Sequence, residues 1–518
     1  MIGIKSDPWF LGIDLGTGSC KSVAVDQHGS ILGFGSGEYP SDSVQSRWKE
    51  QDPEAMLSGM IGSVRAAVES AGVSGSYCAG MSIGSALHGI LAVDRSGRPL
   101  TGVMTWADDR ASCQAGAAKE TDAARSLYAE TGCPIHWMYP LYKILWVKEN
   151  HPETFHLAER FLSAKEYITH KLIREYVIDY SLAAGSGLLN THSLDWSDTA
   201  MKFVEIDRSR LSRLCAPGEC FTGISSELAG AMGIPPATPF VLGSSDAANS
   251  NLGAGAVSSW QSTCMIGTSG ALRIFSSRPV LDPKARSWCY AVDKGRWLVG
   301  GAINNGGVAF SWLQELFNSA SSITGKGARL EFKDLIRIAE GAGVGSNGLI
   351  CLPFFAGERS PNWNLNARAM FFGLNLQHDA RHTARALLEG VAFRMRSLHE
   401  VLGELSGDIR QVRASGGFTR SPLWLQIVSD VLDRELAVPS WGETSSLGAA
   451  FWALLGTGVL ATFEQAEKLV KLDCSYRPEA ANTAVYNRLF EIYQNVYDAM
   501  SRFFEPIAEV QKHLERKG

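Results

Sequence analysis

One pattern occurs twice in this chain, near its start and at the head of its second half, and it restricts the folds open to it. Each copy is an apolar strand, a turn of small residues and a second strand. The turns are Asp14-Leu15-Gly16-Thr17-Gly18-Ser19 and Gly267-Thr268-Ser269-Gly270. Such a turn points backbone N–H groups and a hydroxyl into one space, which suits phosphate oxygens. A plain hairpin turn would explain either copy alone, but two copies predict a nucleotide held between two related domains.

The composition indicates two or more globular domains. A chain of 518 residues is too long for a single hydrophobic core. The shares of 45% apolar and 19% charged residues are those of an ordinary soluble globular protein. The net charge of −5 gives no basic excess for nucleic acid, and no apolar run approaches the ~20 residues of a membrane span. The ten cysteines form no CxxC pair and the histidines show no metal-ligand spacing. We therefore expect a cytoplasmic protein without a structural metal.

Strands followed by helices in both halves predict mixed α/β domains, divided as 1–256 and 257–518. Asp52-Pro53 and Ser421-Pro422 are typical helix starts, with a capping side chain followed by proline. Other expected elements include strands at 9–14, 20–26, 30–37, 262–266 and 271–276, and helices at 154–174, at 379–405 with a stop at Gly407, and at 480–518. The last helix carries the apolar stripe Leu489, Ile492, Tyr493, Val496 and Met500. This stripe would pack on its own domain or on a second subunit of a homodimer, and the first use is commoner.

Two carboxylates at the ends of apolar strands are candidates for chemistry. Asp14 could hold Mg²⁺, directly or through water. Asp246, after the apolar run at 241–242, is well placed to accept a proton from a substrate hydroxyl. The alternative for Asp246 is an N-cap of the following helix.

Three further segments suggest ligand contacts. Gly416 and Gly417 open an approach to backbone where an adenine ring could fit, although a strand-to-helix turn would also use glycine. The segments 105–110 and 355–363 mix tryptophan with acid and arginine, as polyol sites do. Either could instead be a structural Arg–carboxylate pair. His88 could reach a substrate hydroxyl or be a satisfied structural group.

Taken in order, these motifs resemble the FGGY family of carbohydrate kinases, part of the actin-like ATPase superfamily. The matching segments are Gly12–Thr17, Pro140–Trp146, Gly243–Asp246, Gly267–Gly270, Gly373–Gly390, Gly416–Trp424 and Ser445–Ala450. The resemblance implies two ribonuclease-H-like domains with a cleft between them, with sugar bound mainly to the first and ATP to the second. Domain closure would exclude water from the phosphoryl transfer.

The resemblance also implies residue roles. Asp246 would be the general base, and Asp14 and Asp246 would lie near Mg²⁺. The expected nucleotide-binding residues are Gly16, Thr17, Lys21, Gly267, Thr268, Gly307, Gly416, Gly417 and Ser421. The expected substrate-binding residues are His88, Trp106, Asp108, Arg110, Asp246 and Arg359.

Within the family, the segments 85–89, 105–110, 131–136 and 163–168 are most similar to gluconate kinases. We therefore expect ATP-dependent phosphorylation of D-gluconate to 6-phospho-D-gluconate, with Arg110, Arg359 or His88 reading the carboxylate. Leu87 departs from the methionine found in many relatives. A xylulose kinase, or a kinase of another polyol or sugar acid, is the nearest alternative. A protein-directed ATPase or a non-catalytic sugar sensor is a more distant alternative.

Overall fold

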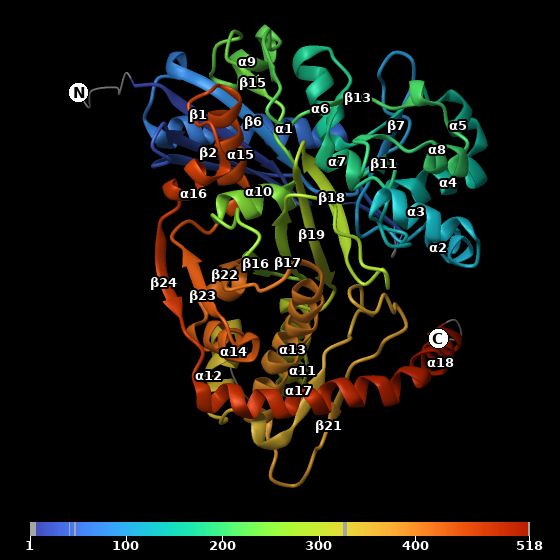
Figure 1. Cartoon of the computed structure of the whole chain (residues 1–518), viewed down its shortest axis with the longest axis vertical. Coiled ribbons are helices and arrows are strands. Elements are labelled where there is room, and N and C mark those ends of the chain that lie inside the picture. Colours follow the sequence, from blue (N-terminus) through green and yellow to red (C-terminus); the bar gives the residue numbers. More distant parts are fainter. Residues whose placement is uncertain (1–6, 41, 46–47, 325–328, 516–518) are drawn as a thin grey trace. The chain divides into compact units, whose positions relative to one another are not determined.

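The computed structural model describes residues 7–40, 42–45, 48–324 and 329–515. The chain forms two compact units, whose segments interleave along the sequence (Figure 1). The first unit contains Met1–Ser258, Phe275–Val299 and Glu443–Lys471, and the second contains Ser259–Ile274, Gly300–Gly442 and Leu472–Gly518. Within the described residues, no helix is both long and apolar enough to cross a bilayer.

The first unit is built on a six-stranded sheet in the order β14-β15-β6-β1-β2-β3. The strands expected at 9–14, 20–26 and 30–37 are confirmed as β1, β2 and β3, which pair in antiparallel order, while β6 and β15 continue the sheet in parallel with β1. The bounds are β1 Trp9–Leu15, β2 Ser19–Asp26, β3 Ile31–Glu38, β6 Cys78–Ser85, β14 Cys220–Phe221 and β15 Phe240–Val241.

Two helices pack on this sheet, α1 (Pro53–Ala71) on β2 and β3 and α15 (Thr444–Gly456) on β1 (Figure 1). Successive residues of a strand face opposite sides. Leu11 and Ile13 join the buried cluster that includes residues of α1, whereas Gly12 faces α15. A Cβ atom on Gly12 would lie 2.1 Å from the carbonyl oxygen of Ser446, so this close approach requires glycine.

The helix start at Asp52-Pro53 is confirmed, because Oδ1 of Asp52 accepts the N–H of Glu54 at 2.9 Å. The helix expected over 154–174 is wrong. It is divided into α5 (Pro152–Leu157), the strand β9 (Arg160–Leu162) and α6 (Ala164–Ile173). The division arises because β9 pairs with β7 (Leu91–Val93) and because Ser163 and Glu166 form a capping box that starts α6.

The first unit contains further strands and helices outside the six-stranded sheet. Their bounds are β4 Asp42–Gln45, β5 Trp48–Gln51, β8 Val103–Met104, α2 Ser112–Lys119, α3 Ala123–Thr131, α4 Pro140–Asn150, β10 Val177–Asp179, α7 Tyr180–Ala184, β11 Leu189–Asn190, β12 Asp195–Trp196, α8 Asp198–Val204, β13 Arg213–Cys215, α9 Ser226–Met232, α10 Asp246–Gly253 and α16 Phe463–Leu469.

The second sheet repeats the strand order of the first. Its strands β19-β17-β16-β22-β23-β24 correspond in order to β3-β2-β1-β6-β15-β14, and both sheets have an antiparallel start and a parallel middle. The bounds are β16 Gln261–Ile266, β17 Gly270–Ser276, β18 Trp288–Asp293, which is also part of this sheet, β19 Arg296–Ile303, β22 Gln411–Ser415, β23 Glu435–Pro439 and β24 Leu472–Tyr476. The fold is therefore a duplicated ribonuclease-H-like α/β architecture.

The long helix expected near 379–405 is confirmed as α13, and Gly407 ends it with a φ of 89°. Ser421 caps α14 as expected. The remaining bounds are α11 Gly307–Thr324, α12 Phe332–Glu340, β20 Ile350–Leu352, β21 Met370–Phe372, α13 Ala380–Ser406, α14 Pro422–Leu432, α17 Ala480–Met500 and α18 Phe504–Glu515.

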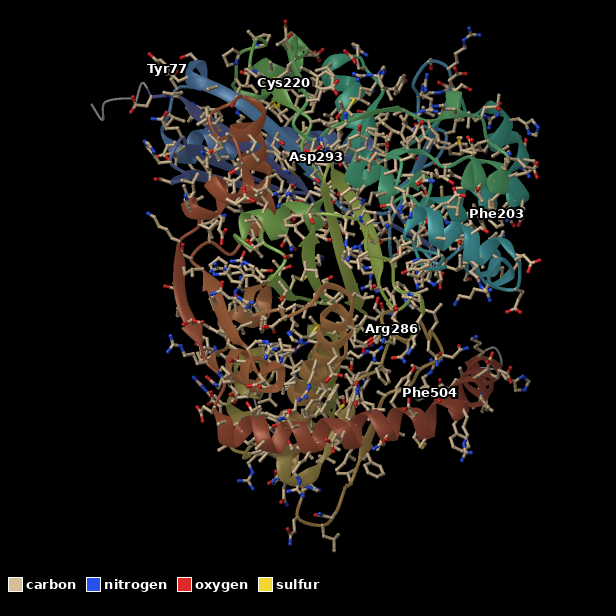
Figure 2. All side chains as sticks on the ribbon, viewed as in Figure 1. Tyr77, Phe203, Cys220, Arg286, Asp293 and Phe504 are labelled. Carbon is tan, nitrogen blue, oxygen red and sulfur yellow. The ribbon has the colours of Figure 1, made fainter. Side chains whose placement is uncertain are left out.

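The C-terminal helices pack within the second unit. Helix α17 contacts α14 and β20. Phe504, labelled in Figure 2, lies at the start of α18. Its ring lies beside those of Phe354 and Tyr497. Ile492 was expected in the apolar stripe but is 43% exposed. Tyr493 and Val496 of the expected stripe are buried, and Tyr486, Phe490 and Tyr497 complete the buried face.

Candidate active site

Asp14 lies near the end of β1, opposite Lys21 of β2. Its buried Oδ1 accepts no hydrogen bond from the described residues. Burial, followed by the charge of Asp246, raises the pKa of Asp14 to about 7, while the nearby Ser445 hydroxyl and Lys21 act in the opposite direction. Burying a charged carboxylate in this position costs free energy unless a cation neutralises it.

Asp246 is the first residue of α10. The N-cap is Ser245, whose Oγ accepts the N–H of Ala248 at 3.3 Å. The alternative use of Asp246 as the helix cap is therefore wrong. The Asp246 carboxylate is half-buried and its Oδ1 accepts the N–H of Ala247 at 2.8 Å.

Asp14 and Asp246 interact electrostatically. The pair suits a Mg²⁺ ion that is shared with phosphate oxygens better than a metal ion held by protein ligands alone. Among the described residues, no group of three or more His, Cys, Asp or Glu is arranged to hold a metal. Mg²⁺ is commonly held by one or two carboxylates together with phosphate oxygens and waters. The buried oxygen of Asp14 without a hydrogen-bond donor fits such an ion.

The turn Asp14–Ser19 is held by side chains from other segments of the first unit. The Trp106 indole donates to Oγ1 of Thr17 at 3.1 Å, and the Gln51 amide donates to the Thr17 carbonyl. Lys21 forms an ion pair with Glu443 at 2.7 Å. Within the turn, the Gly16 N–H donates to the Ser19 carbonyl at 3.0 Å. The turn and Trp106 thus form one connected group.

His88 occupies a left-handed backbone conformation with a φ of 68°. Its Nδ1 lies 2.6 Å from the carbonyl oxygen of Gly185, and its ring meets those of Tyr139 and Tyr290 edge-on. The two tyrosine hydroxyls lie 2.9 Å apart. An imidazole held on three sides has a fixed orientation, which a sugar-contacting group needs.

Lys143 of α4 anchors the segments that carry His88 and Trp106. Its fully buried Nζ donates to the carbonyl oxygens of His88 at 2.8 Å, Met104 at 3.3 Å and Thr105 at 2.6 Å. Burial lowers the pKa of Lys143 to about 7, against an opposing effect of Asp108. Sequence reasoning gave Lys143 no site role, although a lysine between Tyr142 and Ile144 on a buried helix face was a signal.

Asp108 and Arg110 bind each other. Nε of Arg110 donates to Oδ1 of Asp108 at 2.7 Å, and its Nη2 lies 2.6 Å from Oδ2 and 2.7 Å from Oε1 of Glu50. The guanidinium lies over the rings of Trp48 and Trp146, with its Cζ 4.5 and 5.0 Å from their centroids. This is the structural Arg–carboxylate pair that the sequence left open, and a substrate contact by either residue stays a prediction.

Arg359 belongs to the second unit and is 8% exposed. Its Nη2 donates to the carbonyl of Ile303 at 3.1 Å, and its backbone N–H donates to Oε1 of Glu358 at 2.8 Å. The same Oε1 accepts the N–H of Asn304 at 2.9 Å. These contacts support the segment that leads to Gly307, and the substrate role of Arg359 stays a prediction.

The second unit contains a cavity of about 740 Å³. Trp424 and Phe332 give it aromatic walls, and cationic side chains line another part. Its lining includes the expected nucleotide residues Gly267, Thr268, Gly307, Gly417 and Ser421, together with Lys333, Arg337 and Arg420. The preceding Gly416 has a φ of 93° and no room for a Cβ beside Ile266. Apolar walls, cations and glycine N–H groups in one cavity suit a nucleoside phosphate.

Two family models match the chain. The N-terminal domain of the FGGY family of carbohydrate kinases matches residues 9–253, and its C-terminal domain matches residues 262–457. A gluconokinase from Bacillus subtilis is 36% identical over 509 residues, covering 98% of this chain and 99% of that protein. A xylulose kinase from the same organism is 27% identical over 491 residues, covering 94% and 96%.

Solved structures give the same comparison in three dimensions. The gluconate kinase of Lactobacillus acidophilus superposes with a TM-score of 0.91 at 30% identity, covering 97% of this chain and all of that one. A ligand-bound xylulose kinase of the same organism also gives 0.91, at 29% identity, covering 96% of this chain and all of that one. The shared backbone does not distinguish the two sugars, so the choice between them depends on side chains.

Proposed function

Because the chain belongs to the FGGY family of carbohydrate kinases and is a phosphotransferase that uses ATP, we propose that its substrate is D-gluconate and its product 6-phospho-D-gluconate. The observation that carries this choice is the difference between relatives. Identity to a gluconokinase is 36% over nearly the whole chain, against 27% for a xylulose kinase. The demand for ATP favours the cytoplasm as the place of reaction.

Asp246 acts as the general base in this proposal. Its carboxylate accepts the proton of the terminal hydroxyl of gluconate, whose oxygen then forms the bond to the γ-phosphorus of ATP. The bond from that phosphorus to the bridging oxygen breaks, and ADP leaves. Asp14 and Asp246 would hold the Mg²⁺ that enters with ATP, and this ion supplies positive charge against the phosphate oxygens. The half-buried carboxylate at the rigid start of α10 supports this role.

The nucleotide is assigned to residues of both sequence halves. The cavity with Gly267, Thr268, Gly307, Gly417 and Ser421 would hold adenosine and phosphates, with Gly416 allowing the close approach. Gly16, Thr17 and Lys21 would contact the terminal phosphates. This assignment goes with a division of the chain into a sugar-binding domain, 1–256, and an ATP-binding domain, 257–518. The two family matches lie on either side of this boundary and support the division.

The sugar is assigned to the segments that Lys143 anchors. His88 and Trp106 would contact gluconate, while Asp108 and Arg110 would hold the Trp106 segment in place through their mutual pairing. Arg110, Arg359 and His88 are the cations available for the carboxylate.

Substrate choice is tested by ATP-to-ADP turnover of the purified protein with Mg²⁺ and a panel of gluconate, xylulose, ribulose, fuculose, erythritol and glycerol. We expect kcat/KM for gluconate to exceed every other value by at least about tenfold, since loss of a bonded polar group costs this much or more. Preference for xylulose, the second candidate, would keep the kinase and replace the substrate.

A further inference from the structure

A chain of buried polar contacts begins at an ion pair that the proposed reaction does not use. Nζ of Lys165 lies 2.8 Å from Oδ2 of Asp179, and both side chains are almost completely buried. Removing two charges from water costs several kcal/mol for each ion, which only pairing and further hydrogen bonds offset. Such a pair adds little net stability, so a role in fixing local geometry deserves a test.

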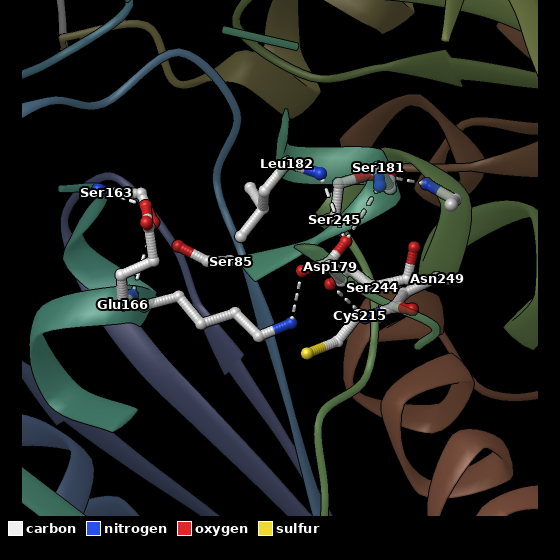
Figure 3. Close-up of polar contacts among 12 residues, drawn as sticks. Ser85, Ser163, Glu166, Asp179, Ser181, Leu182, Cys215, Ser244, Ser245 and Asn249 are labelled. Carbon is white, nitrogen blue, oxygen red and sulfur yellow. Dashed lines mark hydrogen bonds and ion pairs between the residues drawn. The ribbon is translucent and has the colours of Figure 1, made fainter. Parts of the chain in front are cut away.

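Asp179, held by Lys165, also fixes the start of the short helix α7. Its second oxygen, Oδ1, accepts the N–H groups of Ser181 at 3.0 Å and Leu182 at 3.1 Å, and so caps α7 (Figure 3). Lys165 is itself fixed, because it follows the Ser163 cap of α6. The orientation of Ser181 is thereby set by Lys165 of α6 and by Asp179 at the end of β10.

Ser181 then reaches the start of α10. Its Oγ lies 2.5 Å from Oγ of Ser245, and neither residue is exposed to solvent (Figure 3). Ser245 caps α10 and also forms an isolated parallel bridge with Ser85, which ends β6. Both the hydroxyl and the backbone of Ser245 are therefore held, and Asp246 follows it directly.

We propose that Lys165, Asp179 and Ser181 are positioning residues that hold Ser245 and, through it, the Asp246 carboxylate. This inference rests on the proposed role of Asp246 as the base. Proton transfer requires the base within about 2.6–3.2 Å of the hydroxyl. A displacement of about 1 Å can cost ~100-fold in rate, so small rotations of the first turn of α10 matter.

The test compares Ser181→Ala, Ser245→Ala and the double variant, because these changes remove hydroxyls without leaving a buried charge unpaired. Rates are expressed per ATP-binding site, so that unfolded protein does not count. We expect Ser181→Ala to lower kcat ~10-fold, with the KM for ATP within about twofold of the parent. The double variant should fall no further than the worse single variant, because both act through one contact. Ser181→Thr, which keeps the hydroxyl, should recover most of the rate.

Ser63→Ala is the matched control. Oγ of Ser63 lies 2.6 Å from Oγ of Ser22, and both residues are fully buried, but their contact joins α1 to β2 and not α7 to α10. Its kcat should stay within about twofold of the parent, and its effect should add to that of Ser245→Ala. An unchanged kcat in Ser181→Ala, or additive losses in the double variant, would overturn the positioning role.

Asp246→Asn, assayed in parallel, separates this inference from the proposed function. If Asp246→Asn keeps substantial turnover, the base assignment fails regardless of the serine variants. If Asp246→Asn is inactive while Ser181→Ala is fully active, only the positioning role fails.

Discussion

Nζ of Lys21 lies 2.7 Å from Oε2 of Glu443, although 422 positions separate the two residues. Lys21 is the register partner of Asp14, and Glu443 immediately precedes α15. The pair joins the late segment Glu443–Lys471 to the first phosphate turn, in agreement with the place of that segment in the first unit. The two side chains have opposite effects on Asp14, because Lys21 lowers its pKa and Glu443 raises it.

Lys21→Met tests the phosphate role of this pair. The variant loses a cation and leaves the Glu443 carboxylate facing the phosphates, so the KM for ATP should rise ~10-fold with little change in the KM for sugar. Arg65→Met is a suitable control, because Arg65 also bonds a carboxylate, Glu69 at 3.1 Å, but on an exposed helix surface. An unchanged KM for ATP would remove Lys21 from the nucleotide site.

Lys143→Met tests the anchor of the sugar segments. Methionine has a similar length but cannot donate to the three carbonyl oxygens, and each lost bond to a charged donor is worth about 1.5–3 kcal/mol. We expect the KM for sugar to rise at least ~10-fold and the KM for ATP to stay within about twofold. Steady-state kinetics with each substrate varied in turn measures both values. An equal rise in both would indicate general loss of structure instead.

Trp106→Phe removes the hydrogen bond to Thr17 while keeping an aromatic ring. The phosphate turn and the sugar segment should then move more independently, and kcat/KM should fall ~10-fold without a large change in Tm. Trp260→Phe, at a side chain that is 41% exposed in the second unit, should leave kcat/KM unchanged. Full activity of Trp106→Phe would show that this contact does not contribute to catalysis.

His399 of α13 predicts a pH dependence of stability. Burial, together with Arg434 and Arg396, lowers its pKa from 6.5 to about 4. Between these two pH values the imidazole is protonated in the unfolded chain but not in the native state. The free energy of unfolding should therefore fall by on the order of 3 kcal/mol as the pH drops from about 6.5 to about 4. Urea unfolding of His399→Gln should show a smaller fall over this range. An equal fall in variant and parent would assign the pH dependence to other groups.

Much of the fold was predictable because local signals agreed with the tertiary structure. The strand–turn–strand repeats, the Asp52 cap and the Gly407 stop depend on nearby residues. The division of 154–174 was not predictable from helical spacing, because it depends on β9 pairing with β7, whose residues lie far away in the sequence. The exposed Ile492 was missed for a similar reason, since the buried face of α17 is set by the elements packed on it.

The candidate site was predictable where glycine and carboxylate patterns mark turns and strand ends, as at Asp14, Asp246 and Gly267. The supporting residues were not. Glu443 and Asp179 gain their roles only through long-range contacts, which a single sequence does not reveal. Lys143 was missed as well, although a lysine on an apolar helix face is a local signal of a buried polar partner.

Identification of the product tests the central claim most directly. The protein is incubated with D-gluconate, ATP and Mg²⁺, and the phosphorylated sugar is identified by phosphorus NMR and mass spectrometry, with Asp246→Asn in parallel. The account predicts 6-phospho-D-gluconate formed in equal amount with ADP by the parent, and none by Asp246→Asn. Formation of ADP without a phosphorylated gluconate, or phosphorylation of gluconate by Asp246→Asn at the parent rate, would contradict it.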